Sequence, residues 1–177
     1  MKKAFLYFTI LFCGLYSAQE SKTILAGKQI SINYPASYVK SYDLHDDAML
    51  QMSNSIAEKY SIIIQDEKAG LQFYQLAFNN LEDAVKFYSK NLSEGLEKSK
   101  TSKISLGKVG DHNIAQITIE GINTDEESGE KSKIFYLFSL VETQDYYYQI
   151  LSWTLFENKD KYVDEFKNIA STFKEIK

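Results

Sequence analysis

The chain has 177 residues and a mass of 20.4 kDa, a length that suits one domain. Its 20 basic residues are all lysines, and 24 acidic residues give a net charge of −4. An acidic chain without arginine is a poor nucleic-acid binder, because phosphate binding needs clustered positive charge. Hydrophobic residues make up 44% of the chain and proline occurs once, which excludes disordered, collagen-like and low-complexity classes.

The N-terminus has the pattern of a secretory signal peptide. Two lysines precede an apolar run over residues 4–16, and small and polar residues follow it. We predict a signal peptide over residues 1–18, cleaved after Ala18 or Gln19. The apolar run is shorter than the ~20 residues of a transmembrane helix, so no permanent membrane span is expected after cleavage. The predicted location is the periplasm or the extracellular space.

The only cysteine, Cys13, lies inside this apolar run. It follows Phe12, whereas lipidation requires a small residue before the cysteine, so we predict no lipid anchor. The mature chain then has no thiol for a disulfide, a nucleophile or a metal site. Its stability has to come from the hydrophobic core of one domain, predicted over residues 23–177.

The first part of the mature chain is predicted to form β-strands. Apolar and polar residues alternate over residues 30–34, as in a half-buried strand. Leu50 and Met52 indicate a second, weaker strand. Residues 60–64 are apolar enough for a central strand. The segment 69–78 fits either a strand or a loop.

Two amphipathic helices are predicted from apolar residues at helical spacing. Asn79 or Asn80 can cap the first helix, and Asn158 or Asp160 the second. Ser89 falls on the polar side of the first. The apolar stripes consist of Leu81, Ala84, Val85, Tyr88, Leu92 and Leu96 in the first helix and of Tyr162, Val163, Phe166, Ile169, Ala170 and Phe173 in the second.

Four successive strand patterns separate the two helices. They cover residues 104–109, 114–122, 134–141 and 146–156, and short polar segments join them, as in an antiparallel meander. Each amphipathic helix needs a sheet face to cover its apolar stripe. The predicted fold is therefore α+β: an α-β-α sandwich in which two main helices flank an antiparallel sheet of about six to seven strands.

This pattern resembles the Mog1/PsbP-like domains. The resemblance is carried by residues 30–35, 106–107, 115–121 and 146–150, and by Phe166, Ile169, Ser171 and Phe173. Members often have a tryptophan soon after the opening proline, where this chain has Tyr38. The resemblance implies an α-β-α sandwich around an antiparallel sheet. Members include a plant photosystem subunit, a nuclear-transport factor and exported bacterial proteins, and no catalytic motif defines the family, so it implies a fold and no particular activity.

The densest group of possible metal ligands is Asp43, His45, Asp46 and Asp47. Carboxylate and imidazole groups suit manganese, calcium or zinc, and the resemblance to plant members associated with manganese and calcium points the same way. Contiguous ligands rarely converge without partners from elsewhere, so a solvated loop is the competing interpretation. The acidic segment 123–130 lacks the bidentate glutamate of a calcium loop and is predicted to be a charged hairpin tip.

No catalytic residues and no cofactor site are predicted. The two histidines, the missing mature cysteine and the absence of a G-x-S-x-G motif leave little material for a nucleophilic triad. His112 falls in a polar turn and is assigned no role. Tyr146, Tyr148 and Trp153 form a possible binding surface, although alternate strand positions face opposite sides, so at least half of the aromatic residues belong to the core.

These observations lead to one main hypothesis and two alternatives. The chain is expected to be an exported, non-catalytic binding or assembly module for an unknown protein or small ligand in the cell envelope. A metal-binding protein that uses the 43–47 loop is the first alternative. A structural envelope protein without a ligand is the second.

Overall fold

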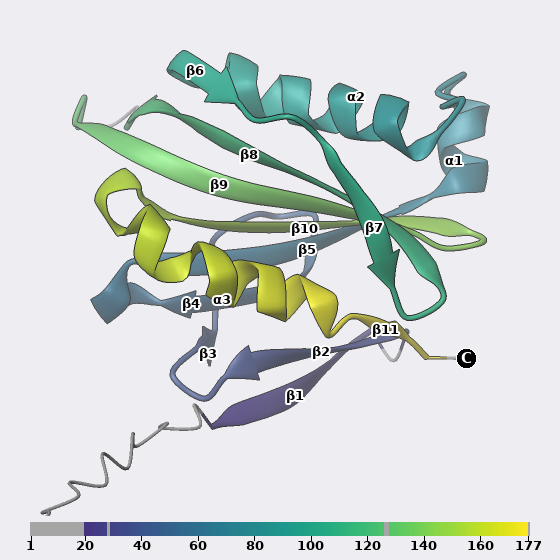
Figure 1. The fold of residues 1–177 in the computed structure, drawn as a ribbon, viewed down its shortest axis with the longest axis horizontal. Helices are drawn as coiled ribbons and strands as arrows, with labels where there is room; N and C mark the ends of the chain where they lie inside the picture. The colour runs from purple at the N-terminus through teal and green to yellow at the C-terminus, as the bar shows by residue number, and fades with distance from the viewer. Residues whose placement is uncertain (1–19, 28, 126–127, 177) are drawn as a thin grey trace, which may run out of the picture.

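The computed structural model describes residues 20–27, 29–125 and 128–176. The predicted signal peptide and its cleavage site lie outside these residues. Within them, no helix is both long enough and apolar enough to cross a membrane. In the described residues a first run of five strands is followed by two helices, and a second run of five strands by one helix and a short last strand (Figure 1).

The strands are β1 (Ser21–Ala26), β2 (Ile30–Pro35), β3 (Val39–Lys40), β4 (Ala48–Asn54), β5 (Lys59–Glu67), β6 (Glu97–Thr101), β7 (Ser105–Val109), β8 (His112–Thr124), β9 (Lys131–Glu142), β10 (Tyr146–Leu155) and β11 (Lys174–Glu175). The helices are α1 (Lys68–Phe73), α2 (Leu81–Glu94) and α3 (Lys159–Ser171), with short 3-10 turns at Ser55–Ala57 and Phe156–Asn158.

In the described residues, eight strands form one antiparallel sheet in the order β3-β4-β5-β10-β9-β8-β6, and β7 also pairs with β8. The predicted meander from β7 to β10 is confirmed. The predicted opening strand is not in this sheet: β2 pairs with β1 and β11 in a separate sheet of three strands. The predicted antiparallel sheet is confirmed, but it has eight strands instead of about six to seven, because it contains the unpredicted β3 and β6 and not β2. Apolar alternation shows which face of a strand is buried and not which strand it pairs with.

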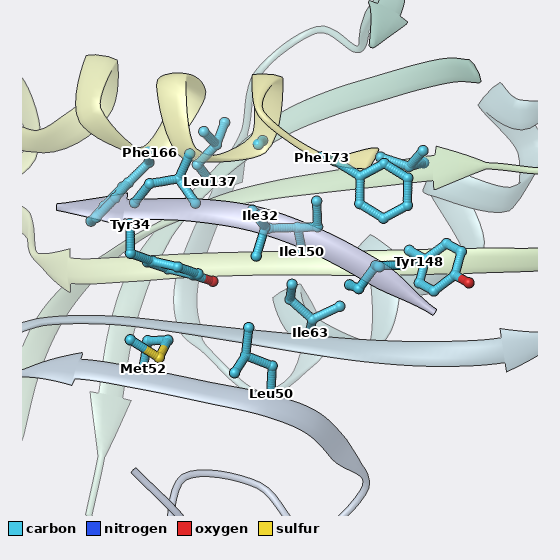
Figure 2. Packing of buried hydrophobic residues seen from close by; sticks show 14 of the residues in the cluster. Ile32, Tyr34, Leu50, Met52, Ile63, Leu137, Tyr148, Ile150, Phe166 and Phe173 are labelled. Carbon is cyan, nitrogen blue, oxygen red and sulfur yellow. The ribbon is translucent and has the colours of Figure 1, made fainter. Parts of the chain in front are cut away.

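The large sheet has a layer on each face (Figure 1). Helix α2 packs on β8, β9 and β6, and α3 packs with the small sheet on the other face. The main core lies between the large sheet, α3 and β2, where Ile32, Tyr34, Ile150 and Phe166 are all buried (Figure 2). The predicted α+β class and the two flanking helices are confirmed.

Two local predictions differ from the structure. Part of the ambiguous segment 69–78 is helical, since α1 follows directly on β5. Ser89 of α2 is buried and not on an exposed polar face. Because α2 contacts β6 as well as β8, its buried arc is wider than one apolar stripe. The Asn80 cap is confirmed: its side chain accepts a hydrogen bond of 2.9 Å from the backbone N–H of Asp83.

A buried ion pair ties α3 to the large sheet. Lys59 on β5 donates hydrogen bonds of 2.6 and 2.9 Å to the two carboxylate oxygens of Glu165 on α3. The ammonium group also lies 4.9 Å from the ring centre of Tyr38 and 4.7 Å from that of Tyr162. The Tyr38 hydroxyl donates to Glu165 at 3.0 Å. The cation is therefore paired and enclosed by aromatic rings, which is how a buried lysine becomes tolerable.

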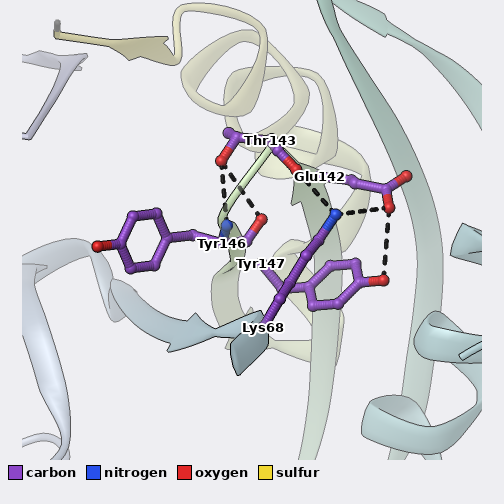
Figure 3. A network of polar contacts seen from close by, with 5 residues as sticks. All are labelled: Lys68, Glu142, Thr143, Tyr146 and Tyr147. Atoms are coloured by element: carbon purple, nitrogen blue, oxygen red, sulfur yellow. Dashed lines mark hydrogen bonds and ion pairs between the residues drawn. The ribbon is translucent and has the colours of Figure 1, made fainter. Parts of the chain in front are cut away.

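A second polar network holds α1 at the turn between β9 and β10 (Figure 3). The Lys68 ammonium donates to Glu142 at 2.9 Å and to the carbonyl oxygen of Thr143 at 2.8 Å. The Tyr147 hydroxyl donates to the same Glu142 oxygen at 3.4 Å. The Tyr146 backbone N–H donates to the Thr143 hydroxyl at 3.3 Å, which closes the turn. These contacts place α1 at one end of the α2 face of the sheet.

The close approach of β8 to the start of β6 requires a glycine at position 121. A β-carbon there would lie 2.7 Å from Cβ of Leu96 and 3.2 Å from the carbonyl oxygen of Glu97. We expect Gly121→Ala to lower the free energy of unfolding by about 1–3 kcal/mol, because the backbone has to move apart. The matched control is Gly70→Ala on α1, where the added carbon meets nothing within 4 Å. Urea unfolding of both variants tests this, and equal midpoints would contradict it.

Five tyrosines with raised pKa values are expected to make the fold sensitive to alkali. Burial is the main cause that raises the pKa of Tyr147 and Tyr148 to about 12, from 10.0. Burial also raises the pKa values of Tyr34, Tyr38 and Tyr88 above the ordinary value. A folded-state pKa above the unfolded one gives stability that is complete below pH ~10 and falls as the pH rises towards the folded value.

A titration of tyrosinate absorbance tests this expectation in the native chain. Tyrosinate absorbance should rise in two phases, and the five tyrosines with raised pKa values should ionise in the second phase, as the fold is lost. Urea midpoints should decline above pH ~10 in step with the second phase. A single phase with all tyrosines near the ordinary pKa would contradict the prediction.

Candidate functional site

Helix α2 covers only part of the sheet face on which it lies. It packs chiefly on β8, while same-face residues of β5 and β10 are left beside it. Because strand side chains alternate, residues 60, 62 and 64 of β5 share this face with residues 149, 151 and 153 of β10, which pair with them directly. Two hollows lie one after the other along these rows: the loop between β3 and β4 lines both, and α2 forms a wall of the second.

The first hollow, here called the aromatic hollow, has a volume of about 450 Å³. Its floor contains Tyr60 and Trp153, whose ring centres are 5.4 Å apart with an angle of 20° between the planes. Tyr136 continues the row on β9, 6.1 Å from Trp153. The residues that line the aromatic hollow include Leu44, Glu58, Tyr60, Glu130, Ile134 and Trp153.

The second, the aliphatic hollow, has a volume of about 590 Å³ and lies further along the same two strands. Leu71 of α1 and the α2 side chains at positions 87, 88 and 92 form one wall. The floor is largely aliphatic, and Phe87 of the wall is 37% exposed. Other residues that line the aliphatic hollow include Asp47, Ile62, Ile64, Asp66, Phe138 and Leu151.

A polar cluster interrupts the aliphatic hollow at Asp66. The amide of Gln149 donates a hydrogen bond of 2.6 Å to the Asp66 carboxylate. The Tyr88 hydroxyl is buried and makes no hydrogen bond of ordinary geometry with the described residues. Burial, and then the negative charge of Asp66, raise the pKa of Tyr88 above its ordinary value. Among the described residues Asp66 forms no ion pair, and the groups that contact it in this cluster, the Gln149 amide and the Tyr88 hydroxyl, are neutral.

The charges in both hollows have one sign. Glu58 and Glu130 line the aromatic hollow, and Asp47 and Asp66 line the aliphatic one. Within the described ranges none of these four carboxylates forms an ion pair, and no lysine lines either hollow. Apolar walls of low polarisability concentrate such a field in the hollow, which favours a cationic ligand.

The three aromatic residues predicted as a binding surface do not lie together. Tyr148 is fully buried in the main core, with its ring centre 5.0 Å from that of Phe173. Tyr146 is half-buried on the same side of β10. Trp153 lies on the opposite side of the strand, in the aromatic hollow. Only Trp153 is placed to bind a ligand in the two hollows, because odd and even positions of a strand face opposite sides.

The predicted metal ligands form an internally bonded loop. Asp43 accepts a hydrogen bond of 2.6 Å from the Ser41 hydroxyl, which is the main cause that lowers the pKa of Asp43. Nδ1 of His45 accepts one of 3.2 Å from the backbone N–H of Asp47. Across the described part of the chain, no three histidine, cysteine, aspartate or glutamate side chains come together as a metal site. Asp46 is exposed, and metal binding by this loop stays a prediction from sequence.

The remaining candidates have structural environments. The His112 ring lies 6.1 Å from the ring centre of Phe173, and its Nε2 atom lies 3.9 Å from Glu175. The described residues of the segment, 123–125 and 128–130, lie at the end of the β8–β9 hairpin, where the backbone N–H and the hydroxyl of Ser128 both donate to Asp125 at 2.7 Å. Part of this hairpin end, including Glu130, lines the aromatic hollow.

Sequence reasoning missed most of the residues that line the hollows. Tyr60, Asp66 and Phe87 were not singled out, because each belongs to an ordinary strand or helix pattern. A signal for Trp153 was present: it differs in parity from Tyr146 and Tyr148, so it had to face the other side of the same strand. The pairing of Trp153 with Tyr60 depends on the β5–β10 register, which alternation alone does not give.

Comparison with known proteins identifies the fold. No protein family and no curated protein matches the sequence. The Ran-binding protein Mog1p of Saccharomyces cerevisiae superposes with a TM-score of 0.62 at 12% identity, over 90% of this chain and 97% of that one. The cyanobacterial PsbP protein of Synechocystis also gives 0.62 at 12% identity, over 92% and 96%.

LpqN, which is involved in cell envelope biogenesis of Mycobacterium tuberculosis, is a third structural neighbour. It has a TM-score of 0.54 at 11% identity, and the match covers 89% of this chain and 91% of LpqN. At these identities the likeness shows the fold. The predicted Mog1/PsbP-like fold is thus confirmed.

Proposed function

We propose that the mature chain is a non-catalytic binding module of the cell envelope, and that its binding site consists of the aromatic and aliphatic hollows beside α2. The observation that carries the proposal is the partly covered sheet face. Apolar and aromatic side chains of β5 and β10 line two adjoining hollows there. Concave, mostly apolar surfaces with a few polar groups are the usual form of a binding site.

Other observations support the proposal. The N-terminal pattern favours export. Two neighbours with this fold are a Ran-binding protein and a protein of cell envelope biogenesis, so the fold is used for binding and in an envelope setting elsewhere. The Asp66 carboxylate is hydrogen-bonded to the neutral amide of Gln149, and no nucleophile is paired with a base among the described lining residues.

Site-specific photo-crosslinking in the native host tests the proposal. A benzophenone analogue of phenylalanine replaces Phe87 at the aliphatic hollow, and in a control chain it replaces Leu25 of β1, which is 65% exposed and far from the hollows. We expect a discrete crosslinked product from position 87 only, and its loss when Trp153→Ala is added. No product at position 87, or the same product at position 25, would overturn the proposal in favour of a structural envelope role.

A further inference from the structure

We propose that the two hollows together bind an extended, basic segment of a partner polypeptide, with two cationic side chains about four residues apart and apolar side chains between them. This inference rests on the proposed function and specifies the partner of that site. Three features carry it: the spacing of the floor residues, the sign of the charges, and the apolar surface between the charges.

The spacing comes from the strands themselves. Tyr60 in the aromatic hollow and Ile64 in the aliphatic hollow are four residues apart on β5, as are Trp153 and Gln149 on β10. At the usual rise of a strand this is about 13 Å, the length of four residues of an extended chain. An extended segment laid along β5 and β10 therefore reaches both hollows with side chains four positions apart.

The charges determine which side chains fit at the two ends. At one end Glu58 and Glu130 lie beside Trp153 and Tyr60, so an ammonium or guanidinium group there would contact carboxylates and aromatic faces together. At the other end the Asp66 carboxylate accepts a hydrogen bond from Gln149, which pairs with Ile64, and no lysine lines this hollow, so a cation beside Ile64 and Gln149 would meet an unbalanced negative charge. An anionic lipid or a nucleic acid would be repelled at both ends.

The surface between the two charged ends is apolar. Ile64, Leu71, Leu92 and Phe87 stay partly exposed along the aliphatic hollow, above the buried residues Ile62 and Leu151. A polyamine has the required charges but only a thin methylene chain to place against this surface. A peptide with branched or aromatic side chains between its cations buries more apolar area there. The floor therefore favours a peptide.

Fluorescence anisotropy with the natively processed protein tests the inference. The probe is a labelled peptide of about nine residues, with two lysines four positions apart and valine and isoleucine between them. Three comparison peptides carry glutamates in place of the lysines, adjacent lysines, or serines in place of the apolar residues. We expect only the two-lysine probe peptide to bind well, and its binding should weaken as ionic strength rises from about 0.05 to about 0.5 M.

Variants of the protein locate the binding. Glu58→Gln together with Glu130→Gln should weaken binding about five- to tenfold, and Trp153→Ala about tenfold or more. Asp164→Asn is the matched control, since that carboxylate lies on α3 in the opposite layer and pairs only with Lys167 at the surface. It should leave binding unchanged. Circular dichroism melts confirm that each variant is folded.

The inference is overturned if the glutamate peptide binds as well, if Asp164→Asn weakens binding as much as the site variants, or if spermidine displaces the peptide at a similar concentration. Absence of peptide binding also overturns it. If crosslinking from position 87 persists in that case, the proposed binding function stands with a different partner. If that crosslinking is absent too, both proposals fall.

Discussion

Lys59→Met is expected to lower the free energy of unfolding by about 3–5 kcal/mol, because it leaves the buried Glu165 carboxylate without its cation. The Lys59 side chain is 4% exposed and that of Glu165 is 15% exposed. Removing the cation leaves a carboxylate in a site that water reaches poorly, with the Tyr38 hydroxyl as a neutral donor. The loss should appear as a lower urea midpoint.

Two further variants separate charge burial from lost packing. Lys59→Met combined with Glu165→Leu should recover much of the stability, because no charge then remains in the site. Lys86→Met breaks an ion pair with Glu82 in which both side chains are about half-exposed, and it should lower the urea midpoint far less than Lys59→Met does. If Lys59→Met were as mild as Lys86→Met, the buried pair would not be a main tether of α3.

Phe166→Ala is expected to cost about 3–5 kcal/mol, because a fully buried ring of α3 is lost from the main core. The ring lies near Leu137 and Tyr34, so the vacated space borders the large sheet and β2 (Figure 2). Collapse of this space would require movement of three elements, which favours a high cost.

The control for this prediction is Phe73→Ala. That ring belongs to α1 and is 81% exposed, so its removal should change the free energy of unfolding by less than about 0.5 kcal/mol. Urea unfolding measures both variants on the same fold. Similar effects of the two substitutions would mean that α3 does not carry the core as the structure indicates.

The partly covered sheet face leaves room for the proposed ligand. A complete helical layer would bury β5 and β10, as α3 and the small sheet bury Ile63 and Ile150 on the opposite face. Because α2 is displaced towards β8 and β6, the rows of β5 and β10 beside it form a floor of strands that α2 covers only in part. Rigid strands hold side chains in fixed positions, which lowers the entropic cost of binding.

The individual elements were predictable because their signals are local. The apolar stripe that includes Ala84 and Val85 predicted the helix α2, and the alternation of apolar and polar residues around Ile114 and Ile117 predicted the strand β8. The prediction that Ser89 lies on the polar side was wrong, since its hydroxyl group donates to the carbonyl oxygen of Lys86 within the helix and α2 contacts β6 as well as β8. The short strands β1, β3 and β11 have no pattern long enough to stand out, and pairing alone defines them.

From the order of residues alone one can deduce the two amphipathic helices, the four-strand meander, the acidic character and the predicted export signal, because each depends on neighbours a few positions apart. Tertiary structure decided the rest. It placed β2 in its own sheet, buried Tyr148, turned Trp153 to the other face and set Tyr60 beside it. These outcomes depend on register and pairing between distant segments, which are selected by the packing of the whole chain and leave no mark in any short stretch of sequence.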